Sequence, residues 1–336
     1  MAQFAQFALT RAVLALITLL TVSLIVFTLM ELVPGTCAER YLAFKNTQGS
    51  QITIADIEAE EKRLGLDKPF PVRWGNWVYN VFVHGEFGDS CILRLNINQL
   101  LSDKFWISLG ICMAALILSY AIAVPIGIIS ASSDNPVTNN SLRFVSYLGL
   151  ALPNFLLALI IMLISTVLFG DSLTGLFSKE YRDAAWSWAK FGDFISRAWL
   201  PVFILGWSAT AFALQTVRAL MLDEIGKLYV TAASARGVSG AKLLWRYPAK
   251  HSLGPVINSL GFDLNRIFNE LPIVALILTL TEAGALLFES LARSNDQQLA
   301  GAIIFLLTAS IVALNFVTDI LLALIDPRVR RGIIGS

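Results

Sequence analysis

Long apolar runs alternate with polar segments along this chain of 336 residues. A helix needs about 20 apolar residues to cross a hydrocarbon core of roughly 30 Å. Because lipid offers no partners to backbone groups, each such run is predicted to be an α-helix. Runs of this length cover residues 12–33, 106–131, 145–169, 198–222, 256–280 and 299–324. The pattern therefore predicts an all-α, polytopic membrane protein with six transmembrane helices in a single domain, residues 1–336.

The composition supports a membrane protein and excludes other classes. Hydrophobic residues make up 56% and charged residues 15% of the chain, against about 45–50% and about 25% in soluble domains. The net charge of +1 lacks the basic excess typical of nucleic-acid binding. The first run follows Arg11, and its residues 12–30 contain no charge. Because five more runs follow it, it is predicted to be a retained span rather than a secretory signal.

Basic residues in short flanking segments predict the orientation, since Lys and Arg concentrate on the cytoplasmic side. The loop at 223–254 carries five of them: Lys227, Arg236, Lys242, Arg246 and Lys250. The tail after Asp326 carries three more, and Arg11 precedes the first run. Both termini and the 223–254 loop are therefore expected in the cytoplasm, and the loops at 35–104 and 170–197 outside it.

The outer loop at 35–104 contains a predicted amphipathic helix at residues 54–64. Thr53 and Asp56 form a capping pair at its start, apolar residues recur at helical spacing, and Gly65 is a stop signal. Two roles are open for this loop, a packing cap and a docking surface for a soluble partner.

The cytoplasmic loop at 223–254 has an alanine-rich core, residues 229–236, that ends at Gly237. This pattern predicts a short helix, a stop and a second helix. Two short helices on the cytoplasmic face of a membrane protein would offer a surface to a soluble partner. The alternative is a solvated basic loop held by anionic lipid.

Three charged residues fall inside the fifth predicted span, namely Asp263, Arg266 and Glu270. Spacings of three and four place them on one helix face, and charges at this depth rarely face lipid. One hypothesis is that this face lines a translocation path and contacts charged ends of a solute. The other is an internal ladder of ion pairs that only holds helices together.

Cysteine and histidine are too sparse for a metal site. Cys37 and Cys91 both fall in the outer loop, where they either form a disulfide or remain two unrelated thiols. Cys112 lies inside an apolar run and is predicted to be a buried hydrophobe. The two histidines, His84 and His251, cannot build a zinc site, so no metal is expected.

The chain also lacks the residues for ATP chemistry. The nearest approach to a phosphate-binding loop, residues 237–242, has the wrong spacing and no hydroxyl after its lysine. No catalytic set is evident either. The chain is therefore predicted not to be an enzyme and to bind no cofactor itself.

Several short motifs occur in one order along almost the whole chain. They are Leu32-Val33-Pro34-Gly35, Leu64-Gly65-Leu66-Asp67-Lys68-Pro69, Gly85-Glu86-Phe87-Gly88-Asp89-Ser90, Leu200-Pro201, Val217-Arg218, the 229–237 segment with Pro255 beyond it, and Asp326-Pro327-Arg328-Val329-Arg330. In this order the chain resembles the membrane permeases of ATP-binding-cassette (ABC) importers, specifically the dipeptide/oligopeptide/nickel type.

The resemblance implies a type I ABC importer permease in the bacterial inner membrane. Such a half-pore pairs with a second, usually related permease and works with an extracytoplasmic substrate-binding protein. Two cytoplasmic ATPase subunits, which bind ATP and Mg²⁺, drive alternating access. The ATPase-coupling residues implied in this chain are Tyr229, Thr231, Ala232, Ala233, Ala235, Arg236 and Gly237.

Two departures from the family pattern occur, and the second affects the expected solute. Thr231-Ala232-Ala233 replaces the Glu-Ala-Ala of general permeases, as is frequent in the peptide subfamily. Thr281-Glu282-Ala283-Gly284 keeps only the last glycine of a Pro-Gly-x-Gly turn. Peptides are the leading expectation, with oligosaccharides, opines or metal chelates as alternatives in the same class. A stand-alone channel or secondary carrier would instead show internal repeats or a midplane ion site, and no inverted repeat is evident.

Overall fold

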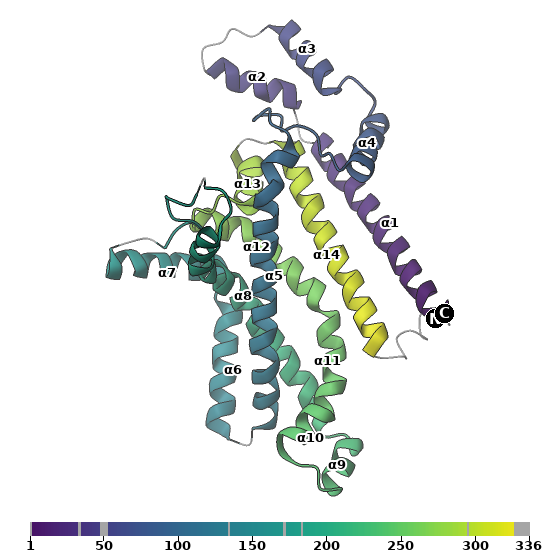
Figure 1. The fold of residues 1–336 in the computed structure, drawn as a ribbon, viewed down its shortest axis with the longest axis vertical. Coiled ribbons are helices and arrows are strands. Elements are labelled where there is room, and N and C mark those ends of the chain that lie inside the picture. The colour runs from purple at the N-terminus through teal and green to yellow at the C-terminus, as the bar shows by residue number, and fades with distance from the viewer. Residues whose placement is uncertain are drawn as a thin grey trace. The chain divides into compact units, whose positions relative to one another are not determined.

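The protein is helical throughout the part of the chain that the computed structural model describes (Figure 1). The described residues are 2–32, 35–47, 53–133, 135–170, 173–182, 184–293 and 296–325. Within them the one β-type contact is an isolated antiparallel bridge between Asp89 and Asn96. The expectation of an all-α protein is therefore confirmed for this part of the chain. Pro34 and the motif at 326–330 lie outside the described residues.

The chain divides into two compact units by its internal contacts. The single domain that was predicted for residues 1–336 stays a prediction. Unit 1 comprises residues 1–11, 109–280 and 313–336, and unit 2 comprises residues 12–108 and 281–312. Three long helices contribute to both units: α1 (Ala2–Leu32), α5 (Ile97–Ser132) and α14 (Gln297–Ile325).

Unit 1 is built around the 38-residue helix α8 (Trp188–Ile225). This helix contacts α6 (Pro136–Ala151), α7 (Asn154–Phe169), α11 (Pro248–Asn258) and α12 (Leu260–Ile277). Two short helices, α9 (Leu228–Ala235) and α10 (Gly240–Arg246), follow α8 and lie at the end of unit 1 next to α11 (Figure 1).

Small residues let the helices of unit 1 approach closely. A Cβ atom added at Gly127 of α5 would lie 2.8 Å from Cβ of Val217 in α8, and one at Gly149 of α6 would lie 2.7 Å from Cβ of Ala211. Packing of this kind associates helices in lipid, where apolar burial gives no advantage. A cluster that includes Val217, Met221 and Val256 continues the contact between α8 and α11.

Unit 2 contains the remaining short helices of the chain. They are α2 (Cys37–Thr47), α3 (Ile54–Leu64), α4 (Phe70–Tyr79), a π-helical turn η1 (Asn80–His84), α13 (Ala283–Phe288) and a second π-helical turn η2 (Glu289–Arg293). Tyr41, Leu42 and Cys91 form a small core with Ile57 and Leu66 packed against it.

Four helices are long and apolar enough to cross a membrane, among the described residues: 6–29, 97–132, 188–225 and 298–320. A bent pair, α6 with α7, raises this number to five if the pair is one span. These segments contain the second and fourth predicted spans and overlap the first and the sixth. The chain is thus a multi-pass membrane protein, and the exact number of six spans stays a prediction.

The third and fifth predicted spans differ from continuous helices. The predicted 145–169 span crosses a bend of 97° between α6 and α7, because Pro153 holds the preceding Leu152 in an extended conformation with ψ of 111°. The predicted 256–280 span is divided at Ser259 between α11 and α12. Three charged residues in α12 explain why it is not among the apolar spans.

The amphipathic helix predicted at 54–64 is α3, with the same bounds. The backbone N–H of Thr53 donates to Oδ2 of Asp56 at 2.9 Å, which completes the predicted capping box. Gly65 ends the helix in the left-handed conformation with φ of 67°, which a residue with a Cβ adopts only at a cost.

The buried carboxylate of Glu60 connects α3 to another part of unit 2 through ion pairs. Glu60, 8% exposed, pairs with Arg63 at 2.7 Å and with Arg94 at 2.7 Å. The guanidinium of Arg94 also lies 3.9 Å from the centre of the Tyr41 ring. Hydrogen bonding from Arg63, with the charge of Arg94, lowers the pKa of Glu60 below its ordinary 4.5.

We expect Glu60→Gln to lower the free energy of local opening of α3 by about 1–2 kcal/mol, because two charge-assisted hydrogen bonds are weakened. Hydrogen exchange of the α3 amides measures this. Since the folded pKa is lowered, the wild-type contribution is complete above pH 4.5 and is lost as the pH falls through the folded value. Glu58→Gln on the exposed face is the control. Equal exchange in both variants would contradict the role of Glu60.

Candidate functional site

The first candidate site is the segment of α9 and α10, residues 228–246, where helix, stop and second helix occur as predicted. Gly237, with φ of 88°, directly follows Arg236, the C-cap residue of α9. Its N–H donates to the Ser234 carbonyl at 2.9 Å, and the N–H of Val238 donates to the Ala233 carbonyl at 3.2 Å. These two bonds form a Schellman motif, which gives α9 a defined end.

The side chains of α9 divide into an inner and an outer set. Ala233 and Val230 are buried, and Tyr229 is half-buried. The outer face carries Leu228, Thr231, Ala232 and Ala235 at positions i, i+3, i+4 and i+7, all exposed, which defines one stripe of the helix. We call these four residues the α9 stripe. Leu228 is 87% exposed, and the stripe is apolar or small, which favours close approach of another protein surface.

Of the predicted coupling residues, the structure thus exposes Thr231, Ala232, Ala235, Arg236 and Gly237 and buries Ala233. Leu228 was not among the predicted coupling residues, although its spacing from Thr231 and Ala232 indicates the same helix face. Whether these residues contact a partner stays a prediction.

Tyr229 fixes α9 to the helices on both sides of it. Its hydroxyl donates to Oε2 of Glu224 at 2.5 Å, and its ring meets the His251 ring edge-on at 5.2 Å. Burial and the hydrogen bond to the Glu224 carboxylate raise the pKa of Tyr229, so the hydroxyl keeps its proton and stays a donor. Lys227 also pairs with Glu224. Together these contacts make α9 a rigid extension of α8 and α11.

The second candidate site is the charged face of α12. Asp263 is fully buried and accepts a hydrogen bond from the hydroxyl of Tyr120 in α5. That hydroxyl also lies 2.9 Å from Oγ of Ser259. Glu270 lies near Asn154 of α7 and Ser208 of α8. The two acids, Asp263 and Glu270, are therefore directed to different neighbouring helices.

Arg266 takes a position that the sequence did not predict. Its guanidinium lies 4.1 Å from the centre of the Phe212 ring and 5.6 Å from that of Phe262. Among the described residues no ion pair within 4.0 Å joins Arg266 to Asp263 or to Glu270. Cation–π contacts replace the internal ladder that was one of the two interpretations. The role of this face in transport stays a prediction.

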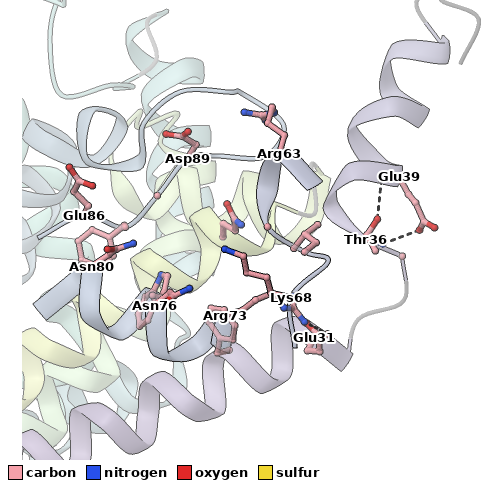
Figure 2. Close-up of a pocket in the computed structure, with 18 of the residues that line it drawn as sticks. Glu31, Thr36, Glu39, Arg63, Lys68, Arg73, Asn76, Asn80, Glu86 and Asp89 are labelled. Carbon is pink, nitrogen blue, oxygen red and sulfur yellow. Dashed lines mark hydrogen bonds and ion pairs between the residues drawn. The ribbon is translucent and has the colours of Figure 1, made fainter. Parts of the chain in front are cut away.

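The third candidate site is a pocket of about 620 Å³ in unit 2 (Figure 2). Residues from α1, α2, α3, α4 and the turn at 85–89 line it. Figure 2 shows Lys68 reaching from the turn after α3 toward Asn76 and Asn80. Arg73 is paired with Glu31 at 2.5 Å. Lys68, Glu86 and Asp89 have no ion pair within the described part of the chain.

Two predictions about cysteine chemistry have different outcomes. Cys91 is buried and disulfide-bonded, and Cys112 is a free, buried thiol as expected. The side chain of Cys37 lies outside the described residues, so the Cys37–Cys91 pairing stays a prediction. No cluster of His, Cys, Asp or Glu that could hold a metal occurs in the residues that the structure describes.

Comparison with known families gives matches over most of the chain. The model of the family "Binding-protein-dependent transport system inner membrane component" matches residues 123–331. A second model, for the N-terminal part of such transport-system membrane components, matches residues 4–94. Together they include α3, the pocket, the α9 stripe and the charged face of α12.

Individual relatives match along nearly their full length. The oligopeptide transport system permease protein AppB of Bacillus subtilis (strain 168) is 27% identical over 326 residues, 97% of this chain and 99% of AppB. The nickel import system permease protein NikB of Staphylococcus aureus (strain bovine RF122 / ET3-1) is 26% identical over 321 residues, 95% of this chain and 90% of NikB.

One solved structure supports the fold. It is titled "Inward facing conformations of the MetNI methionine ABC transporter: CY5 native crystal form". It matches with a TM-score of 0.52 and 14% identity, over 68% of this chain and 97% of the other. At this identity the likeness is evidence for the fold alone.

Proposed function

Because this chain belongs to the family of binding-protein-dependent transport system inner membrane components and is a permease of an ABC importer, we propose that its cargo is peptides. The similarity to AppB, a permease of an oligopeptide transport system, over 97% of the chain supports this cargo. The similarity to NikB favours a second candidate, a nickel-containing solute. The absence of a described metal-ligand cluster is compatible with either, since a chelate needs no direct ligands from the permease.

The proposed assembly is a half-pore with partners on both sides of an inner membrane. A second, related permease completes the pore, and two ATPase subunits bind ATP and Mg²⁺ in the cytoplasm. A binding protein delivers the solute from outside. The basic residues of the 223–254 loop support a cytoplasmic place for α9 and α10, and both termini would then be cytoplasmic.

The main observation that supports a role of this chain in coupling to ATPase subunits is the exposed α9 stripe. A rigid helix presents one apolar and three small, exposed residues, and no described residue of the chain covers Leu228. Such a surface is suited to insertion into a groove of an ATPase subunit, with Arg236 at its edge for an acidic partner residue. Closure of the ATPases would push α9, and its links to Glu224 and His251 would pass the movement to α8 and α11.

Co-purification tests this assignment. When the permease is purified from its own membrane in mild detergent, ATPase subunits are expected to accompany it in a ratio of about one ATPase subunit per permease chain. A permease that purifies with no nucleotide-hydrolysing subunit under conditions that keep it folded would contradict the proposal.

The pocket of unit 2 is the proposed docking place of the binding protein. It combines the ammonium group of Lys68 with the carboxylates of Glu86 and Asp89 in the lining of one recess, and none of the three forms an ion pair within 4.0 Å among the described residues. A partner surface with complementary charges could pair with both, and such pairs fix orientation as well as adding affinity. This choice favours docking over the packing-cap role of the 35–104 loop.

We expect Lys68→Gln and Glu86→Gln each to weaken binding of the binding protein about fivefold, since exposed ion pairs contribute up to about 1 kcal/mol. The effect should decrease at high salt. Binding of the purified binding protein to the transporter in nanodiscs measures it. Lys62→Gln, on the exposed side of α3 and outside the pocket, is the control. Unchanged affinity in both pocket variants would exclude this docking place.

A further inference from the structure

Asp263 presents a buried carboxylate oxygen that has no partner. The side chain is 0% exposed. Its Oδ2 accepts the Tyr120 hydroxyl, but Oδ1 has no hydrogen bond in the described structure. A buried charged oxygen without a partner destabilises the state that contains it. Such a group in a membrane span therefore requires an explanation.

Glu270 repeats this feature on the same face of α12. Its Oε2 is buried and also has no hydrogen-bond partner among the described residues. Asp263 and Glu270 are seven residues apart, which is two helical turns and about 10 Å along the axis. Each of the two acids thus carries an acceptor oxygen without a partner, Asp263 fully buried beside α5 and Glu270 partly exposed near α7 and α8.

One positively charged side chain, Arg266, acts on both Asp263 and Glu270 through its field. It forms no ion pair with either, because its guanidinium is held against Phe212 at 4.1 Å. The described parts of α5 after Lys104 and of α7 contain no charged side chain. The three charges of α12 therefore sum to one net negative charge, and among the described residues no basic side chain forms an ion pair within 4.0 Å with Asp263 or Glu270.

We propose that Asp263 and Glu270 form a binding site for a positively charged group of the transported solute, an ammonium or a guanidinium. The inference rests on the proposed function and specifies its cargo as cationic peptides. The partly exposed Glu270 receives the cation first. Asp263 becomes available when α12 moves relative to α5 and the bond to Tyr120 is released, and Oδ1 then gains the donor that it lacks here. Arg266 keeps the site from carrying two negative charges.

The experiment compares uptake of trilysine and trialanine by vesicles that contain the complete transporter with its own binding protein. Selection by the binding protein is the same for every permease variant. A change in the ratio of trilysine to trialanine uptake therefore reports on the permease. We expect Glu270→Gln to lower this ratio about threefold to tenfold, and Arg266→Gln to raise it by a similar factor, because the two changes shift the local charge in opposite directions.

Three further variants serve as controls and alternatives. Asp319→Asn removes another carboxylate of unit 1, one paired with Arg11 at 3.3 Å, and should leave the ratio unchanged. If Glu270→Gln does not assemble, Asp263→Asn carries the same expectation, and Glu270→Asp should retain the wild-type ratio. A structural role alone would reduce uptake of both peptides together and would not give opposite shifts.

The outcomes distinguish failure of the proposed cationic site from failure of the proposed peptide transport. An unchanged ratio in both the Glu270 and Arg266 variants would overturn the inference, and would mean that the acids are protonated or are neutralised by the second permease. Absence of ATP-dependent uptake of both peptides by the wild-type complex would instead refute peptide transport itself, and the cationic site with it.

Discussion

Replacing Ala232 by Arg is expected to abolish ATP-driven uptake while the permease remains folded in the membrane. Ala232 is exposed on α9 and lies in the middle of the α9 stripe, between Leu228 and Ala235. A long charged side chain there would prevent close approach and would place an unpaired charge in the contact. Truncation or distortion at the centre of a contact costs several kcal/mol, so we expect the ATPase to bind at least about a hundredfold more weakly.

The measurement is the amount of ATPase subunit that purifies with the variant, together with uptake into vesicles. Ala59→Arg is the matched control, since Ala59 is also an exposed alanine in a short helix, α3, but lies in the 35–104 loop. Wild-type co-purification and uptake in Ala232→Arg would show that the α9 stripe is not the coupling surface.

Replacing Gly127 by Leu is expected to prevent stable packing of unit 1. A Cβ atom at this position would lie 2.8 Å from Cβ and Cγ1 of Val217 and 3.1 Å from the backbone oxygen of Leu214. Because the obstruction includes backbone of α8, rotation of one side chain cannot remove it. Overpacking of this kind costs about 1–3 kcal/mol per site or more, and in lipid the close contact is itself the source of helix association.

The unfolding temperature in detergent and the yield of monodisperse protein measure this effect, and both should fall strongly. Gly110→Leu is the control in the same helix, because a Cβ atom at Gly110 would meet nothing within 4 Å. If the two variants behaved alike, the contact between α5 and α8 would not be the packing that holds unit 1 together.

Local signals in the sequence predicted much of the fold. The capping pair at Thr53 and the stop at Gly65 defined α3, and Gly237 defined the end of α9, because each signal acts within one helical turn. Apolar runs located the long helices α1, α5, α8 and α14. A proline in an apolar run marks a local break but is compatible with both a bent and a continuous helix, and the chain bends by 97° at Pro153. Pro125, by contrast, lies inside the continuous α5. No signal in the sequence marked the break at Ser259.

The candidate site could be predicted only in part. Periodicity identified Asp263, Arg266 and Glu270 as one face of a helix, but their partners come from distant helices. Tyr120 is 143 positions away from Asp263 in the sequence, and nothing in a single sequence indicates that contact. The same limit applies to the stacking of Arg266 on Phe212 and to the pocket, whose walls come from several helices of unit 2.

The central claim is that this permease moves solute only when ATPase subunits act on it through α9. The most direct measurement is peptide uptake into sealed vesicles that contain the permease pair with its binding protein, with and without the ATPase subunits and ATP. We expect uptake against a gradient only when ATPases and ATP are both present, and none with Ala232→Arg. Concentrative uptake by the permease without any nucleotide-hydrolysing subunit would contradict it.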